Sequence, residues 1–402
     1  MTISDIYEPA EDSYLLQKYV RQNASGRVLD MGTGSGIQAL TAVVNPAVRE
    51  IVAVDINPDA VAALQEQIRE QRLRKIKVLQ GDLFEPIEGQ FDLIIFNPPY
   101  LPQDEGIEDH ALYGGKKGWE ISERFFHRAS RFLLPTGKIL FLFSSLTNKE
   151  KIEQIMSHHL FTFVEIASEK VAFEILYVYE IKKSSLLREI EGKAVEEIEY
   201  YTEGKRGIIY RGKVDINQFV KKFIPLKKKY VEVAIKVKKE GSTAEGTIEK
   251  EAQWLERLNR LRIGPRLIFA TPNCVITEFI AGENLPEWLG HHSSKECRSI
   301  LVQVLTQCFI LDQQKVTKEE MHHPYKHIIV TPFEGPVMID FERCHETEKP
   351  QNVTQFVEYV CRLKPVLEKN GLTIDVDKLR AAAKDYKEKY TKEMFDKIVK
   401  LI

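Results

Sequence analysis

Hydrophobic residues in the first half of the chain form short continuous runs that alternate with longer, helically spaced segments. The continuous runs read RVLDMG, EIVAVD, KIKVLQ, FDLIIF and GKILFLF, and segments between them such as AVAALQEQIREQ have apolar residues at helical spacing. Apolar strands separated by amphipathic helices predict an α/β fold, with a mostly parallel sheet covered by helices on both faces. In such a sheet, ligands bind beyond the C-terminal ends of the strands.

The pattern changes after residue 183. Two strands flank a turn at Gly204–Gly207, a third strand reads KYVEVAIKVKK, a helix with one apolar face follows, and later strands read CVITEF and GPVMIDF. The run from residue 354 to the C-terminus has helical spacing, with lysine and glutamate on its outer positions. Hairpins and helices without βα repetition predict a second domain of the α+β class.

Composition narrows the class of protein. Hydrophobic residues make up 43% and charged residues 29% of the 402 positions, which excludes a wholly disordered or fibrous chain. No apolar run approaches the roughly 18–20 residues that a membrane helix needs, so no membrane contact is expected. The first residues carry acids and do not predict a secretory signal. Five cysteines without a CxxC pair predict neither a disulfide framework nor a zinc site, and favour the reducing cytoplasm.

The net charge differs in sign between the two halves of the chain. Residues 1–182 carry 19 basic and 26 acidic side chains, a net charge of −7, whereas the remaining residues carry 38 basic and 33 acidic side chains, a net +5. We therefore expect two domains, residues 1–182 and 183–402. Residues 201–240 hold twelve basic and four acidic side chains. Such a stretch fits a phosphate-rich partner, and a solvated strand edge explains it about as well.

Three aspartates stand where strands of the first domain are expected to end. Asp30 precedes a glycine-rich turn that lets a ligand approach the backbone closely, Asp55 is placed to accept both hydroxyls of an adenosine ribose, and Asp82 is placed to meet an adenine amino group. The turn alone would also suit a dinucleotide or mononucleotide, and each aspartate alone could be a turn or helix cap. Three at successive strand ends predict a nucleoside site. The glycines of the turn are Gly32, Gly34 and Gly36.

The fourth apolar run leads directly into Asn97-Pro98-Pro99-Tyr100. The two prolines hold the backbone extended and prevent it from continuing the sheet. The Asn97 side-chain oxygen and the Pro98 carbonyl can then accept both hydrogens of one planar NH₂ group, which directs its nitrogen toward an electrophilic methyl group. This is catalysis by positioning, with Tyr100 as an aromatic wall.

Residues 1–182 resemble class I S-adenosylmethionine-dependent methyltransferases, which have a Rossmann-like sheet. More narrowly they resemble the HemK2/Mtq2 branch, which methylates the GGQ glutamine amide of translation release factors. The narrower resemblance rests on YEPAEDSYLL, DINP, FNPPY and GGKKG. It implies that Glu11 and Asp12 lie near cofactor and substrate, although a helix cap explains Asp12 equally well. It also implies a small zinc-binding activator of the Trm112 type at the sheet edge.

The acceptor stays open at this point. Related enzymes with the same NPPY motif methylate adenine N6 or guanine N2, so an RNA methyltransferase with a second domain that helps bind RNA is an alternative. The acidic balance of residues 1–182 argues mildly against extended nucleic-acid binding by that domain.

Residues 190–402 resemble small protein-kinase-like folds of the RIO/Bud32 type, with an N-lobe at about 190–280 and a C-lobe at about 281–402. The resemblance implies that Lys236 binds the phosphates of ATP and is oriented by Glu251, and that Asp340 holds Mg²⁺. It also implies that the hairpin at Gly204 and Gly207 covers the phosphates. Adenine would bind the backbone of a hinge formed by Glu278-Phe279-Ile280.

The catalytic loop departs from this family. The expected HxD…N sequence is replaced by KEEMHHPYKH, so no aspartate accepts the substrate proton and no asparagine holds a second metal. Glu320, His322 or His323 could serve as the base, and His327 stands where the asparagine is expected. An inert ATP-sensing pseudokinase is therefore an alternative. The sequence HPYKHIIV…IDFER also resembles archaeal predicted Ser/Thr kinases, some of which phosphorylate a ribose 2′-hydroxyl of tRNA.

The sequence thus predicts a cytoplasmic bifunctional enzyme. The first domain is expected to methylate a release-factor glutamine with S-adenosylmethionine. The second is expected to use ATP and Mg²⁺ to phosphorylate tRNA, through the basic 205–239 region, or a Ser/Thr protein.

Overall fold

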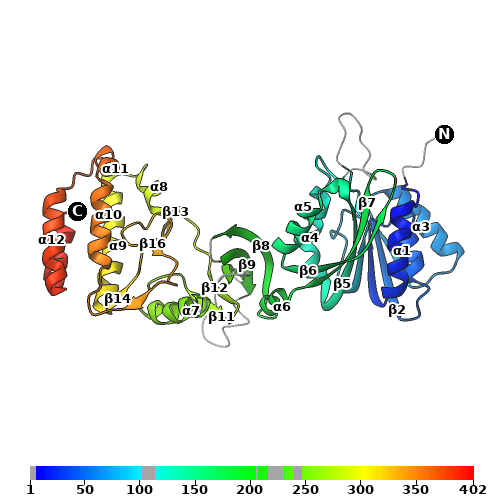
Figure 1. Ribbon diagram of the computed structural model, residues 1–402, viewed down its shortest axis with the longest axis horizontal. Coiled ribbons are helices and arrows are strands. Elements are labelled where there is room, and N and C mark those ends of the chain that lie inside the picture. Colours follow the sequence, from blue (N-terminus) through cyan, green and yellow to red (C-terminus); the bar gives the residue numbers. More distant parts are fainter. Residues whose placement is uncertain (1–5, 102–113, 205–206, 216–229, 239–246) are drawn as a thin grey trace. The chain divides into compact units, whose positions relative to one another are not determined.

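A computed structural model describes residues 6–101, 114–204, 207–215, 230–238 and 247–402. The chain forms two compact units, Met1–Tyr200 and Tyr201–Ile402 (Figure 1). The division falls inside strand β8 (Val195–Glu203), C-terminal to the change in net charge at residue 182. Between these two positions lie the end of β7 and helix α6 (Ser185–Glu191), which pack within the first unit.

The first unit is built on a seven-stranded sheet in the order β3-β2-β1-β4-β5-β7-β6. The five strands from β3 to β5 are parallel, and β7 and β6 add antiparallel. The predicted mostly parallel, Rossmann-like sheet is thus confirmed, and the antiparallel pair at one edge is an addition. The strands are β1 (Gly26–Met31), β2 (Val48–Asp55), β3 (Ile76–Gln80), β4 (Phe91–Phe96), β5 (Leu133–Ser144), β6 (Phe161–Lys170) and β7 (Ile175–Lys183).

Helices cover both faces of this sheet. On one face, α1 (Glu11–Asn23), α2 (Ile37–Ala42) and α3 (Pro58–Glu70) contribute aliphatic side chains to a buried cluster. On the other, α4 (Glu120–Phe132) packs phenylalanines against those of β4 and β5, and α5 (Lys149–His158) lies beside α4. Covering both faces is what allows the central strands to be apolar throughout.

The second unit begins with a five-stranded sheet in the order β11-β12-β10-β9-β8. Where the register is resolved, neighbouring strands are antiparallel. Helix α7 (Thr247–Leu258) packs on β10, β11 and β12. The strands that follow β8 are β9 (Gly207–Asp215), β10 (Tyr230–Lys238), β11 (Leu267–Ala270) and β12 (Cys274–Glu278).

The rest of this unit is mainly helical and shares one buried core with α7. Its helices are α8 (Leu285–Leu289), α9 (Ser294–Gln313), α10 (Asn352–Arg362), α11 (Lys364–Lys369), α12 (Val376–Lys389) and α13 (Lys392–Lys400). Two small sheets complete it, β13 (Glu283–Asn284) with β15 (Ile328–Thr331) and β16 (Gly335–Met338), and β14 (Val316–Thr317) with β17 (His345–Glu346). Among the described residues, no helix is both long and apolar enough to cross a membrane.

Candidate functional sites

The C-terminal ends of β1, β2, β3 and β4 meet at one edge of the first sheet. Met31 of β1 is in register with Val54 of β2 and with Phe96 of β4, and Asp55 of β2 is in register with Gln80 of β3. The glycine-rich turn, Asp55, Asp82 and the NPPY segment therefore follow neighbouring strand ends, as the sequence pattern predicts.

Asp30, at the end of β1, stabilises the glycine-rich turn through hydrogen bonds. Its buried carboxylate accepts hydrogen bonds from the Thr33 hydroxyl at 2.6 Å and from the Ala39 amide at 3.0 Å. Burial raises the pKa of Asp30 to about 7, against the opposing effect of these two donors. Asp30 Oδ2 accepts both hydrogen bonds, so this side chain joins the end of β1 to the glycine-rich turn and to the start of α2.

The glycines of the turn serve different structural purposes. Gly32, Gly34 and Gly36 have φ of 62°, 51° and 80°, in the left-handed region that favours glycine. A Cβ at Gly36 would lie 2.4 Å from Leu64 of α3, whereas a Cβ at Gly34 would meet nothing within 4 Å. Gly36 therefore permits packing of the turn on α3, and Gly34 leaves open space beside the backbone.

The other two strand-end aspartates differ in their surroundings. Asp55 accepts the Gly34 amide at 2.8 Å and the Asn57 amide at 2.9 Å, which joins the end of β2 to the turn. Asp82 instead forms a 2.5 Å ion pair with Arg124 of α4, and lines a cavity of about 510 Å³ together with His127 and His159. Asp55 thus contacts the glycine-rich turn directly, and Asp82 faces α4.

Asn97 is oriented by Asp12 at the start of α1. The Asn97 amide donates through Nδ2 to Asp12 Oδ2 at 2.8 Å, and the Tyr7 hydroxyl donates to Asp12 Oδ1 at 3.0 Å. Asp12 is 4% exposed, while Glu11 beside it is exposed. Because Nδ2 is committed to Asp12, Asn97 Oδ1 faces the other way; it is buried and has no hydrogen-bond partner among the described residues.

Tyr100 completes this group. Burial raises the pKa of Tyr100 above its ordinary range, and the negative charges of Asp12 and Glu174 add to the effect. Its carbonyl accepts the Thr147 hydroxyl at 3.1 Å, and a Cβ on Gly114 would come within 2.5 Å of the Pro99 carbonyl. The GGKKG segment thus packs directly against NPPY.

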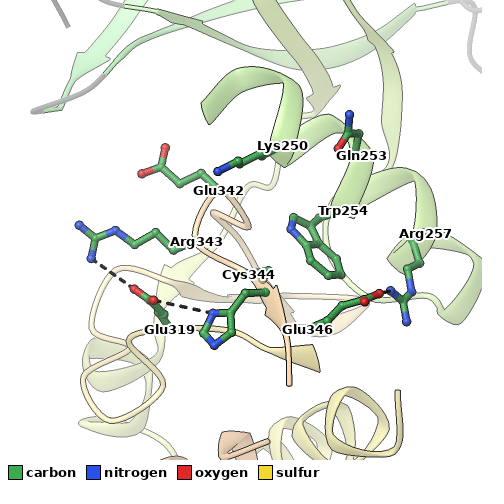
Figure 2. Close-up of a pocket in the computed structure, with 10 residues that line it drawn as sticks. Lys250, Gln253, Trp254, Arg257, Glu319, Glu342, Arg343, Cys344 and Glu346 are labelled. Carbon is green, nitrogen blue, oxygen red and sulfur yellow. Dashed lines mark hydrogen bonds and ion pairs between the residues drawn. The ribbon is translucent and has the colours of Figure 1, made fainter. Parts of the chain in front are cut away.

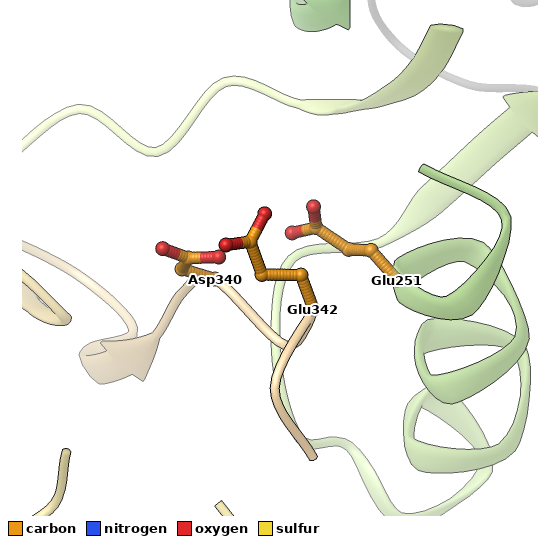
Figure 3. A group of neighbouring side chains, drawn as sticks. All are labelled: Glu251, Asp340 and Glu342. Carbon is orange, nitrogen blue, oxygen red and sulfur yellow. The ribbon is translucent and has the colours of Figure 1, made fainter. Parts of the chain in front are cut away.

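In the second unit, Lys236 on β10 gathers three carboxylates from distant parts of the chain. Its ammonium lies 2.7 Å from Glu251 on α7, and 3.1 Å from both Asp340 and Glu342. Figure 3 shows the three carboxylates pointing toward one another. Burial alone would lower the pKa of Lys236, but the three negative charges raise it well above its ordinary range. Burial also raises the pKa of Glu251, which Lys236 opposes.

Asp340 lies outside the strand in which the sequence pattern places it. Strand β16 ends at Met338, and Asp340 has a φ of 65°. Its carbonyl accepts the ammonium of Lys318 at 2.5 Å, and burial lowers the pKa of Lys318. This buried lysine, together with Lys236, keeps the pKa of Asp340 below its ordinary value despite burial.

The segment that replaces the catalytic loop divides into two groups. Glu320 pairs with His327 at 2.9 Å and with Arg343, and His327 Nδ1 lies 3.7 Å from Asp340 Oδ2. His322 and His323 are exposed and approach Arg362 of α10. Of the three candidate bases, only Glu320 is connected to Asp340 among the described residues, through His327, and the two histidines lie near Arg362.

The predicted nucleotide-binding backbone is partly described. The Gly204 amide donates to the Gly207 carbonyl at 2.9 Å, and Gly207 pairs with Lys238 on β10. Glu278 ends β12 and pairs with Arg266, and half-buried Ile280 follows. Of the basic 205–239 region, positions 205–206, 216–229 and 239 lie outside the described residues.

A cavity of about 780 Å³ is lined by residues of α7 and by Glu342, one of the carboxylates around Lys236. Trp254 and Arg257 of α7 line one side, and residues 342–346 line the other (Figure 2). Its charged groups are largely paired, with Arg257 on Glu346 at 2.6 Å and Arg343 on Glu319 at 3.9 Å.

Sequence reasoning missed three polar groups. Glu342 could have been noticed, because it follows Asp340 by two positions in an apolar strand context. Lys318 and Glu174 carry no local signal, since each acquires its neighbours from segments far away in sequence.

Comparison with known proteins gives a consistent result for the first unit. The family model described as methyltransferase small domain matches residues 10–177. A candidate protein N5-glutamine methyltransferase of Methanocaldococcus jannaschii is 41% identical over 181 residues, which are 43% of this chain and 90% of that protein. The human methyltransferase HEMK2 is 31% identical over 196 residues, 45% of this chain and 91% of that protein.

Among solved structures, the E. cuniculi Mtq2–Trm112 complex, described as responsible for methylation of the termination factor eRF1, is similar at a TM-score of 0.37 and 24% identity. The similarity covers 45% of this chain and 99% of that one. The matches described here cover less than half of this chain, and the family model ends at residue 177.

Proposed function

Through its first unit this chain belongs to the HemK2/Mtq2-like class I methyltransferases, and on that premise we propose that it methylates the side-chain amide of a glutamine in a translation release factor. The names of its relatives, protein N5-glutamine methyltransferase and release factor glutamine methyltransferase, support this acceptor. The single observation that carries the proposal is the orientation of Asn97 by Asp12.

A primary amide needs two hydrogen-bond acceptors to hold its NH₂ group. Asn97 offers Oδ1, which is buried and unpaired among the described residues, and whose orientation is fixed because Nδ2 is bound to Asp12. The Pro98 carbonyl is the second acceptor. With both hydrogens held, the nitrogen lone pair is directed out of the amide plane toward the methyl donor, and no general base is required for the positioning.

The residues at the strand ends fit S-adenosylmethionine, which supplies the methyl group of this family. The open space at Gly34 permits close approach to the backbone, and the Asp55 carboxylate retains lone pairs for ribose hydroxyls beside its two amide donors. Asp30 supports the turn, and Asp82 is the weakest of the assigned contacts because it already pairs with Arg124.

A zinc-binding activator of the Trm112 type is part of this proposal. Strand β3 forms one edge of the seven-stranded sheet, which leaves backbone groups for a further strand. Co-purification with and without such a protein tests this; equal methylation rates and no complex would remove the activator from the proposal.

For the second unit we favour ATP-dependent phosphoryl transfer, in the reducing cytoplasm, to tRNA or to a Ser/Thr protein. The supporting observation is that Lys236, Glu251 and Asp340, from three separate segments, form one partly buried cluster. A lysine that is oriented by a helix acid and lies beside an aspartate is the arrangement that binds nucleotide phosphates and metal in kinases.

The cluster also fits Mg²⁺. Ligand atoms of Glu251, Asp340 and Glu342 lie within 4.8 Å of one another, and carboxylate oxygens are the ligands Mg²⁺ prefers. When the ion and the nucleotide bind, Lys236 would move from Asp340 and Glu342 toward the phosphates. Asp340 would hold the ion, which would offset the negative charge of the phosphates, and Glu320 would be the base that accepts the acceptor's proton.

The proposed functions are tested with labelled donors. Labelled S-adenosylmethionine is incubated with purified release factor, its Gln→Asn variant in GGQ, and tRNA. Label in wild-type release factor alone supports the proposal, whereas label in tRNA alone favours an adenine or guanine methyltransferase.

In parallel, γ-labelled ATP is incubated with tRNA and lysate protein, using wild type and Asp340→Ala. ATP binding without transfer above the variant's background would reduce the second unit to a nucleotide-sensing module.

A further inference from the structure

Glu174 lies at the edge of the sheet where the NPPY segment emerges. In the antiparallel pair of β5 and β7, Ser144 at the C-terminal end of β5 is in register with Leu176, so Glu174 stands two positions beyond that end. Phe141 of β5 is in register with Phe96, the residue before Asn97. Two hydrogen bonds join the same segments, from the Thr147 hydroxyl to the Tyr100 carbonyl and from the Ile175 amide to the Ser145 hydroxyl.

Glu174 directly precedes β7 and stands two positions before Leu176 of that strand. Leu176 belongs to the buried cluster formed with Leu15 and Leu16 of α1, against which Tyr100 also packs. The negative charge of Glu174 contributes to the raised pKa of Tyr100, and among the charged groups only Asp12 contributes more.

One oxygen of this carboxylate, Oε2, is buried and has no hydrogen-bond partner in the described part of the chain. A buried carboxylate oxygen without a donor is costly, and in a native structure it calls for a specific reason. Asn97 Oδ1, at the end of β4 on the other side of β5, is also buried and without a hydrogen-bond partner among the described residues. The acceptor end of the site therefore presents two buried, unsatisfied hydrogen-bond acceptors and a second carboxylate, Asp12.

We propose that Glu174 binds the acceptor polypeptide by accepting a main-chain N–H group next to the target glutamine, an inference that rests on the proposed function of the first unit. A glutamine side-chain amide held by Asn97 brings its own backbone with it, and peptide N–H groups are the donors always available there. Glycines beside the glutamine have no Cβ, so a carboxylate can approach their amides closely.

The same geometry disfavours a nucleic acid. The ring nitrogens that flank the amino group of adenine are hydrogen-bond acceptors. They have no hydrogen to donate to the Glu174 carboxylate, which is itself an acceptor. Two carboxylates, Asp12 and Glu174, would also lie close to the phosphates of a polynucleotide. Glu174 thus selects a peptide amide over adenine at a site whose amino-positioning motif alone accepts either.

The test compares Glu174→Ala and Glu174→Gln with Glu169→Gln in the full-length chain. Glu169 lies on the neighbouring strand β6, is exposed and pairs with Lys18 on the surface at 3.5 Å. Steady-state methylation of purified release factor should show KM for the release factor raised about 10- to 100-fold in Glu174→Ala, the effect of losing one hydrogen bond to a charged group. Affinity for S-adenosylmethionine, measured by calorimetry, should stay within twofold, and Glu169→Gln should match wild type throughout.

A thermal melt of the protein without ligands separates binding from structure. Removing an unsatisfied buried charge should leave the Tm of Glu174→Gln unchanged or higher. An unchanged KM in an otherwise active Glu174→Ala overturns the inference and leaves the proposed function standing. If wild type does not methylate release factor, the proposed function fails, and the thermal melt alone then decides the role of Glu174. A lowered Tm in Glu174→Gln marks a structural role and overturns the inference. An unchanged or raised Tm retains a ligand-binding role for Glu174. Methylation of guanine in RNA that is lost in Glu174→Ala would also overturn the peptide assignment.

Discussion

The two units contain polar sites that are built in opposite ways. In the first unit, hydrogen bonds fix Asn97 and shape the glycine-rich turn, yet buried acceptor oxygens on Asn97 and Glu174 stay unpaired within the described residues. In the second unit, the central ammonium of Lys236 is bound by three carboxylates at once. The first site is already arranged for a neutral donor group, whereas the second is a closed charge cluster.

This difference agrees with the chemistry proposed for each site. Methyl transfer to an amide needs a rigid geometry and little charge compensation, so a prearranged neutral acceptor suffices. Phosphoryl transfer needs cations, and the buried carboxylates that hold them must be neutralised when the ion and nucleotide are away. Lys236 provides that neutralisation in this structure.

Replacing Lys236 with methionine should have the largest effect. Glu251 would lose the ammonium that neutralises its buried carboxylate, which costs about 3–5 kcal/mol of unfolding free energy. Burial raises the pKa of Glu251, so protonation favours the folded state and the deficit should shrink as the pH is lowered. Urea unfolding of the second unit's transition measures this. Lys238→Met on the same strand is the control, and a double variant with Glu251→Gln should recover part of the loss. Equal stability of Lys236→Met and Lys238→Met would contradict the closed cluster.

Replacing Asn97 with alanine tests the first site. We expect the methylation rate to fall about 10²- to 10³-fold, because a prearranged hydrogen bond at the reacting group is removed. Affinity for S-adenosylmethionine should change by no more than a few-fold, since Asn97 is oriented toward the acceptor. Asp12→Asn should lower the rate less, because the Asn97 side chain remains but can rotate. Single-turnover kinetics and calorimetry measure the two quantities, and a loss confined to cofactor binding would reverse the assignment.

Replacing Asp30 with asparagine should change how the stability of the first unit depends on pH. Burial raises the pKa of Asp30 to about 7 in the folded protein, above its ordinary value of 3.8. The folded state therefore holds a proton that the unfolded state loses, so this group's stabilisation is present below pH 4 and is lost as pH rises toward 7, with a slope of ~1.4 kcal/mol per pH unit. Asp30→Asn should flatten this slope for the first unit, and Asp59→Asn, an exposed aspartate at the start of α3, should not.

Replacing Asp55 with alanine should have the smallest effect of the four. The loss of hydrogen bonds to a ribose should weaken S-adenosylmethionine binding about tenfold. Part of that loss comes from the turn, because Asp55 also accepts the Gly34 amide. Calorimetry checks the value; wild-type affinity in the variant would remove Asp55 from the cofactor site.

Local sequence patterns were sufficient for most of the first unit. Apolar strands, glycines at positive φ and the NPPY segment are encoded by neighbouring residues, because backbone conformation and side-chain periodicity are local properties. The same patterns predicted a mostly parallel sheet, which is confirmed, but they did not identify the antiparallel strands β6 and β7. It also placed Asp340 on a strand that ends before it.

The contacts that give each site its chemistry come from packing. Asn97 meets Asp12 across 85 positions and Lys236 meets Glu342 across 106, and the two ends of each pair are brought together by strand register and helix docking. Sequence placed acids and amides at the ends of strands, where any of them could bind a ligand. Tertiary structure then paired Asn97 Nδ2 with Asp12, enclosed Lys236 among three carboxylates and left Glu174 Oε2 unpaired among the described residues. The reason is that hydrogen bonds and desolvation depend on which groups packing brings close together, and not on their separation along the chain.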